Sequence, residues 1–368
     1  MDDAIRLFLG GDVMTGRGID QILPHPSKPH LFEAHVASAE AYLLLAERAS
    51  GPIPRRVAPS YVWGDALAAL ARLRPDVRIV NLETAVTTAE QPAAKGIHYR
   101  MDPANIACLA AARLDCCTLA NNHVLDWGRV GLRETLDTLR AAGLRTAGAG
   151  SCAGQARAPA VLDLAGRGRV LVFAFGTASS GIPPDWAAGP GRPGVARLPD
   201  LSPASLRTVA EAVAAARRPG DLVVISLHWG GNWGFELGQD ELAFGQWLVE
   251  EAGVDLVHGH SSHHARAIQV HRGRLVLHGC GDLLNDYEGI GGYEAWRDDL
   301  AVLHLATLAG RPPRLAALDL EVMQIRRFRL NAASAADTAW LARTLGKASR
   351  RFGTRFHAQG NRIRVGWP

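Results

Sequence analysis

The chain has 368 residues, of which 48% are hydrophobic, and its 40 basic and 36 acidic residues give a formal net charge of +4. This balance suits a globular protein with a sizeable core and excludes a disordered or strongly basic chain. The arginines at 326, 327 and 329 are interpreted as a solvated face rather than a nucleic-acid-binding stripe. We therefore expect no nucleic-acid partner.

The N-terminus and the cysteines predict a cytoplasmic protein. The chain begins Met-Asp-Asp-Ala-Ile-Arg, without the basic start and long apolar stretch of a signal peptide. No window approaches the roughly 18 apolar residues of a membrane span. Its 5 cysteines are an odd number without CxxC spacing, which is typical of reduced thiols in a core. We expect a cytoplasmic location and no membrane partner.

Short apolar runs alternate with helical patterns along the chain. The runs end abruptly in polar residues, as expected of strands buried on both faces. They cover residues 5–9, 77–80, 116–120, 222–227 and 254–257. Helices are predicted at 66–73, 103–112, 131–142, 203–217 (with Ser202 as N-cap) and 239–252. This alternation indicates an α/β fold.

The later part of the chain has a different pattern. Residues 176–200 are rich in Gly and Pro and are predicted to form a long loop, a candidate lid or substrate-binding loop. Antiparallel strands are predicted at 267–270, 274–277 and 301–305, followed after about residue 311 by a strand, a helix near 335–349 and a short end piece.

The polar residues that follow the five strands are the candidates for chemistry, because ligands gather at the carboxyl ends of strands in open α/β sheets. Each alone has an ordinary structural explanation, such as a cap, a turn or a core histidine. Together they offer carboxylate, amide and imidazole ligands, which suit Mn, Fe, Co, Ni or Zn and not Ca or Mg alone. The candidate ligands are Asp12, Glu83, Asn122, His228, His260 and His263.

The same segments carry a resemblance to a known family. They read Gly-Asp-Val-Met-Thr-Gly-Arg (11–17), Asn-Leu-Glu-Thr (81–84), Leu-Ala-Asn-Asn-His-Val-Leu-Asp-Trp-Gly (119–128), His-Trp-Gly (228–230) and Gly-His-Ser-Ser-His (259–263). Together they resemble the CapA family, which is linked to poly-γ-glutamate capsule synthesis and is a divergent branch of the calcineurin-like metallophosphoesterases.

The resemblance implies a fold and a domain division. The expected architecture is α/β, a two-sheet αββα sandwich of the metallophosphoesterase type, with one or two divalent metal ions at the strand ends. The similarity runs from about residue 5 to 310. It therefore predicts a catalytic domain at residues 1–310 and a C-terminal extension, residues 311–368, packed on the same domain.

The resemblance also assigns roles to residues. Asp12 matches the first metal aspartate, and Glu83 stands in place of the bridging aspartate. Asn122 matches the amide ligand, His123 matches the histidine that steadies a leaving group, and His228 matches the next ligand.

Two positions depart from the phosphoesterase pattern. Met14 stands where a histidine ligand is usual. The Gly-His-x-His motif is lengthened to Gly-His-Ser-Ser-His, so whether His260, His263 or both bind metal stays open.

Further residues are predicted around the metal site. Asp126 either orients His123 or caps the helix that starts near Gly128. Arg17 either grips an anionic substrate group, phosphate or carboxylate, or forms a surface salt bridge. The remaining substrate candidates are Trp229, Trp233, Asp282 and Asn285.

Three functions are compatible with this sequence. The first is a metal-dependent hydrolase that cleaves a phosphoester with a metal-activated water, with His123 assisting the leaving group. The second hydrolyses or transfers a γ-glutamyl-type amide bond. The third is a non-catalytic capsule-synthesis accessory protein. Both enzymes would act on a small-molecule or peptide-like anionic substrate, and the sequence leaves the oligomeric state open.

Overall fold

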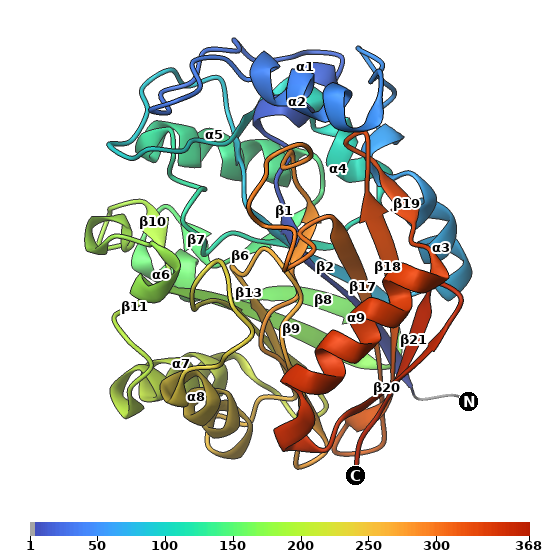
Figure 1. Cartoon of the computed structure of the whole chain (residues 1–368). Helices are drawn as coiled ribbons and strands as arrows, with labels where there is room; N and C mark the ends of the chain where they lie inside the picture. The colour runs from blue at the N-terminus through green and yellow to red at the C-terminus, as the bar shows by residue number, and fades with distance from the viewer. Residues whose placement is uncertain (1–3) are drawn as a thin grey trace.

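Two central β-sheets lie face to face, and helices cover their outer faces, in the computed structural model, which describes residues 4–368 (Figure 1). This arrangement is the expected αββα sandwich. The acidic start, Met1 to Asp3, lies outside the described residues. Within residues 4–368 no helix is long and apolar enough to cross a membrane. The cytoplasmic location stays a prediction.

The first sheet has the strand order β20-β21-β18-β17-β1-β2-β5-β6. Its parallel part consists of β1 (Ile5–Val13), β2 (Val77–Leu82), β5 (Cys116–Thr118) and β6 (Arg145–Ala147), and β16 (Asp282–Leu284) also pairs in parallel with β1. The antiparallel part consists of β17 (Leu300–Ala309), β18 (Arg314–Ile325), β19 (Leu330–Ala332), β20 (Arg355–Gln359) and β21 (Arg362–Gly366).

The second sheet has the order β11-β9-β12-β13-β15-β14, and β8 pairs with β9. Its strands are β8 (Ala160–Leu164), β9 (Gly168–Thr177), β11 (Arg197–Leu198), β12 (Leu222–His228), β13 (Leu256–His260), β14 (Ile268–His271) and β15 (Arg274–Leu277). The prediction of antiparallel strands here is half right. β14 is antiparallel to β15, but β15 is parallel to β13.

Alternating side chains along the strands divide the core into layers. On β1, Leu7 and Leu9 point between the two sheets, whereas Phe8 points outward to the helices beside the first sheet. On β12, Val224 faces the other sheet and Ile225 faces α7 and α8. The central strands of both sheets are therefore buried on both faces, as the short apolar runs predicted.

The helices lie mainly outside this sandwich. They are α1 (Arg17–Ile22), α2 (Glu40–Ser50), α3 (Asp65–Leu73), α4 (Ala107–Ala111), α5 (Gly128–Ala141), α6 (Ala153–Arg157), α7 (Pro203–Ala216), α8 (Gln239–Glu250) and α9 (Ala335–Ala348). Ser202 caps α7 as predicted, its side chain accepting from the Ser205 N–H at 3.4 Å. The two short helices α1 and α2 were not predicted. They lie together at one end of the molecule, opposite the chain termini (Figure 1).

Two further segments bear on the predicted organisation. Residues 176–200 are not structureless, because they contain β11, the strand β10 (Gly194–Val195) paired with β7 (Ala149–Gly150), and two 3₁₀ turns. Their role as a lid stays a prediction.

The predicted boundary near residue 310 falls in the turn between β17 and β18, and residues 311–368 extend the first sheet. A small pair, β3 (Ala85–Val86) and β4 (Arg100–Met101), completes the strands.

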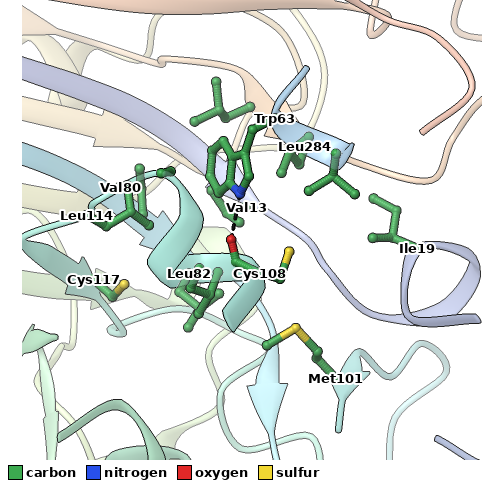
Figure 2. Packing of buried hydrophobic residues seen from close by; sticks show 14 of the residues in the cluster. Val13, Ile19, Trp63, Val80, Leu82, Met101, Cys108, Leu114, Cys117 and Leu284 are labelled. Carbon is green, nitrogen blue, oxygen red and sulfur yellow. Dashed lines mark hydrogen bonds between the residues drawn. The ribbon is translucent and has the colours of Figure 1, made fainter. Parts of the chain in front are cut away.

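Trp63 anchors the helical layer beside the first sheet (Figure 2). Its ring is fully buried among apolar residues that include Val13 and Leu284, and its Nε1 donates a hydrogen bond to the Cys108 carbonyl at 2.7 Å. A buried indole needs such an acceptor, and the carbonyl at the start of α4 gains a donor.

We expect Trp63→Phe to lower the free energy of unfolding by about 1–3 kcal/mol, because the Cys108 carbonyl loses its donor in a buried place. Urea unfolding measures this change. The matched control is Trp340→Phe, which alters a half-buried tryptophan on α9 and should change stability less. Equal losses in both variants would contradict the role of the Trp63 hydrogen bond.

Candidate metal centre

Strand ends from both sheets bring the candidate ligands together. Asp12 lies near the end of β1, and His228 and His260 end β12 and β13, where they are direct neighbours in register. Gly11 permits a close approach on the other side. A Cβ at this position would lie 1.7 Å from the Gly281 carbonyl oxygen, so only glycine fits. This contact sets Asp12 beside Asp282 on β16.

The first group of ligand atoms comes from Asp12, His228 and His260, which offer one atom each within 4.8 Å of one another. The Nδ1 atoms of the two histidines lie 2.8 Å apart, and Nδ1 of His260 lies 3.6 Å from Oδ1 of Asp12. All three residues are at most 1% exposed. The predicted convergence of these residues is present in the structure.

The second group consists of Asp12, His263 and Asp282, again with ligand atoms within 4.8 Å of one another. Nδ1 of His263 lies 3.0 Å from Oδ1 of Asp282. Asp12 therefore belongs to both groups, as a carboxylate shared by two ions would. Both His260 and His263 are in position to bind metal, one in each group.

Asp282 and Asn285 require a correction, because they were predicted to contact substrate. Asp282 is a member of the second ligand group. Asn285 donates from Nδ2 to Oδ2 of Asp282 at 2.8 Å and is 1% exposed, so it orients that carboxylate. The sequence offered no metal-ligand signal at Asp282 because the parallel pairing of β16 with β1 could not be predicted.

Glu83 and Asn122 lie next to the first group. Oε1 of Glu83 is 3.7 Å from Nε2 of His228, and Oδ1 of Asn122 is 3.0 Å from the same nitrogen. The other Glu83 oxygen, Oε2, is buried without a hydrogen-bond partner among the described residues. A buried carboxylate oxygen without a donor is the position in which a cation would be stabilised. The bridging role of Glu83 stays a prediction.

The electrostatics of the cluster fit a divalent cation. Burial raises the pKa of Asp12 to about 7, with the charge of Asp282 adding to the effect, and it raises the pKa of Glu83 well above its usual value, with Asp12 adding to the effect. Burial also lowers the pKa of His228 and His260 well below the usual range, so both rings are neutral and have a lone pair to offer. These carboxyl groups ionise fully only beside a compensating positive charge.

His123 lies at the edge of the cluster, and Asp126 holds the ring nitrogen that is turned away from it. It donates from Nδ1 to Oδ2 of Asp126 at 2.6 Å, and its Nε2 lies 3.8 Å from Oε1 of Glu83. Burial lowers the pKa of His123 to about 4, although Asp126 opposes this shift. Of the two predicted roles for Asp126, orientation of His123 is the one present. The predicted helix-capping role of Asp126 is wrong, because the N-cap residue of α5 is Trp127 and no side chain caps this helix.

Lys95 and Tyr99 complete the surroundings of His123, a role that was predicted for neither residue. Lys95 Nζ donates to Oδ1 of Asp126 at 2.7 Å, and the Tyr99 backbone N–H donates to Oδ2 at 2.7 Å. The Tyr99 ring packs edge-on against His123, with ring centroids 4.5 Å apart. Both residues lie in a polar loop without regular spacing, so no pattern in the sequence pointed to a position beside His123.

The anion-grip role predicted for Arg17 is wrong. Its guanidinium is buried and bonds Asp286 through Nε (3.1 Å) and Nη2 (2.5 Å), and Glu33 through Nη1 (3.1 Å). It also lies over the rings of Tyr42, 3.9 Å from the centroid, and Tyr99, 4.6 Å from the centroid. Two carboxylates already neutralise this cation. Arg17 supports Tyr99 behind His123 and does not face substrate.

The two tryptophans of the His-Trp-Gly segment have different positions. Trp229 is fully buried, stacks on His278 with the ring planes 4° apart, and donates from Nε1 to the His278 carbonyl at 3.0 Å. Its predicted contact with substrate is wrong, because its ring is part of the core. Trp233 is half-buried, lies 5.2 Å from His263 between ring centroids, and stacks on Tyr293. Its substrate contact stays a prediction.

Removal of the shared carboxylate tests the metal centre. Asp12→Ala should lose all bound metal after dialysis, because Asp12 belongs to both ligand groups, whereas His260→Ala should lose the ion of one group only. Elemental analysis of the purified proteins measures the stoichiometry. Asp20→Ala is the control, since Asp20 is an equally buried acid outside both groups. Full metal content in Asp12→Ala would contradict the site.

Arg17 should be important for folding rather than for substrate. Arg17→Met leaves Asp286 and Glu33 without their cation, and breaking a buried pair in this way costs about 3–5 kcal/mol of unfolding free energy. The exposed pair Arg140–Asp137 is the control, and Arg140→Met should change stability by less than about 1 kcal/mol. Urea unfolding compares the two. An unchanged midpoint in Arg17→Met would show that its burial contributes nothing.

Comparison with known proteins agrees with these motifs. A family model described as "Bacterial capsule synthesis protein PGA_cap" matches residues 6–287. A "Probable polyglutamine synthesis accessory protein" of Mycobacterium tuberculosis is 45% identical over 355 residues, which are 96% of this chain and 93% of the relative. The "PGA biosynthesis protein CapA" of Bacillus subtilis is 23% identical over 287 residues, 77% of this chain and 64% of the relative. The chain belongs to the PGA_cap family of bacterial capsule synthesis proteins, the CapA family that its motifs resemble.

Proposed function

We propose that this CapA-family capsule synthesis accessory protein is a metal-dependent hydrolase. The observation that carries the proposal is the pair of buried ligand groups that share Asp12, next to a histidine that Asp126 orients. When bound, one or two divalent transition metal ions would supply Lewis acidity and a water of lowered pKa. Mn, Fe, Co, Ni and Zn all suit this set of oxygen and nitrogen ligands.

The residues of the chain would bind the ions, transfer a proton and hold the proton-transferring histidine in place. Asp12, Asp282 and the three histidines would hold the ions, and Glu83 with Asn122 would complete the ligand set. His123 has its Nδ1 hydrogen fixed on Asp126, so a bare Nε2 faces the cluster, where it would take a proton from a water molecule and pass it to a leaving oxygen or nitrogen. Lys95 and the Tyr99 backbone hold the other side of the Asp126 carboxylate.

Two kinds of bond are candidates for cleavage. Phosphoester hydrolysis follows from the superfamily resemblance, but the guanidinium expected to grip a phosphate is bound to Asp286 and Glu33. The names of two relatives refer to polyglutamine synthesis and to PGA biosynthesis. They support a γ-glutamyl-type amide in a peptide-like anionic substrate as the second candidate.

A non-catalytic role is the third possibility, and the word accessory in the name of the mycobacterial relative supports it. The His123–Asp126 pair argues against it. A metal held only for structure needs no buried histidine beside the ligands with its free nitrogen turned toward them. The proposal therefore depends on His123 as the group that takes up a proton at Nε2 and passes it on.

Replacement of His123 tests the proposal. His123→Ala should keep its metal content, because His123 lies outside both ligand groups, and should lose about 10²–10⁴-fold in turnover, the usual contribution of general acid–base catalysis. The control is His271→Ala, which removes a histidine that pairs with Glu250 far from the cluster. Loss of metal in parallel with activity would make His123 a ligand.

A paired substrate assay separates the three functions. The metal-loaded protein is given a γ-glutamyl anilide and an aryl phosphate under identical conditions. Turnover of the anilide alone supports the amide candidate, and turnover of the phosphate alone supports the phosphoester candidate. A protein that binds metal and turns over neither supports the non-catalytic role.

A further inference from the structure

A second buried histidine, His258, lies directly behind the metal ligand His260. Both residues are on β13, two positions apart, so their side chains point to the same face, between the two sheets. Their ring centroids are 5.2 Å apart. Ser226, the register partner of His258 on β12, contacts both rings. All three side chains are at most 1% exposed.

The hydrogen bonds of His258 fix where its proton lies. Its Nε2 is 2.8 Å from the Gly10 carbonyl oxygen, which can only accept, so Nε2 carries the hydrogen. The ring is fully buried and no carboxylate among the described residues bonds it, so it is neutral. Nδ1 of His258 is therefore a bare acceptor, and it faces the Ser226 hydroxyl at 3.2 Å.

The Ser226 hydroxyl has one hydrogen and three neighbours. Besides His258, Oγ lies 3.1 Å from Oγ1 of Thr118 and 2.7 Å from Nε2 of His260. Donation to His258 satisfies a nitrogen that has no other donor, whereas Thr118 can use its own hydrogen on the Val80 carbonyl at 3.3 Å. Once Ser226 donates its one hydrogen to His258, Oγ can only accept from its remaining neighbours. His260 must then donate from Nε2 to Oγ.

We propose that His258 is a positioning residue that acts through Ser226 to fix the tautomer of His260, so that Nδ1 of His260 is the atom presented to metal. This inference rests on the proposed metal site. Nδ1 of His260 is the nitrogen that faces Asp12 Oδ1 and His228 Nδ1. The relay runs from the Gly10 carbonyl through His258 and Ser226 to His260. Partners of this kind keep a ligating histidine in one ring orientation and one protonation form.

Nitrogen NMR of selectively labelled histidine rings tests the tautomer without any metal or substrate. The metal-free wild type should show His260 protonated at Nε2 and bare at Nδ1. His258→Leu and Ser226→Ala should give a mixture of both forms. His258→Asn, which keeps an acceptor oxygen near the position of Nδ1, should stay closer to the wild type than His258→Leu. A wild-type His260 protonated at Nδ1 would overturn the proposal.

Metal affinity gives a second readout. Cobalt binding, measured by competition with a chelator and by the visible spectrum of the bound ion, should weaken about 10–100-fold in His258→Leu and Ser226→Ala. His304→Leu is the matched control, since His304 is equally buried and lies 3.3 Å from the Leu9 carbonyl without contact to Ser226. Its cobalt affinity should not change even where its stability falls.

The outcomes separate this inference from the proposed hydrolysis. Wild-type protein that binds cobalt with the expected tautomer but hydrolyses nothing refutes the hydrolase and supports the relay. Unchanged cobalt affinity in both Ser226→Ala and His258→Leu overturns the relay and leaves the hydrolase standing. If His258→Leu does not fold, Ser226→Ala decides alone, because it removes a single oxygen atom.

Discussion

The burial of like charges around Asp12 is the constraint on which the rest of the site depends. Asp12, Glu83 and Asp282 are at most 2% exposed and lie together where the two sheets meet. Asp12 accepts from the Asn81 amide at 2.7 Å and from the Ser261 backbone N–H at 3.1 Å, and Asp282 accepts from the Asn285 amide at 2.8 Å. Ser261 adopts a positive φ of 99° to direct that N–H, a strained geometry that a ligand site tolerates.

The sequence predicted the strands that deliver Asp12, Glu83, His228 and His260, because each is a short apolar run that ends abruptly in polar residues. It did not reveal β8, β9, α1 or α2. β9 ends in Gly176 and Thr177 and so delivers no ligand, and α1 begins at Arg17 with a φ of 46° and no side-chain cap. The parallel pairing of β15 with β13 could also not be predicted, because a short apolar run has the same pattern whether its strand is parallel or antiparallel to the next.

Candidate ligands could be predicted where they directly follow an apolar strand. They could not be predicted where their position depends on the pairing of strands that are far apart in sequence. Asp282 joins Asp12 only because β16 returns to β1 from 270 residues away. Arg17 looked like an open anion grip from its distance to Asp12 in sequence. The residues that neutralise it, Glu33 and Asp286, lie in segments without any pattern that points to Arg17. Tertiary counter-charges of this kind decide what an arginine does.

The position of His123 is the feature that favours the proposed catalytic metal site over a structural one. An ion needed only to balance Asp12, Glu83 and Asp282 would be satisfied by the two ligand groups alone. The chain adds a buried histidine whose Nδ1 is fixed by a carboxylate that itself accepts from Lys95 and the Tyr99 backbone. Burying that network costs desolvation, and His123 belongs to neither ligand group. This geometry is explained if Nε2 of His123, which faces the cluster, exchanges a proton with a molecule bound there. An accessory role in synthesis and hydrolytic chemistry are therefore compatible in one protein.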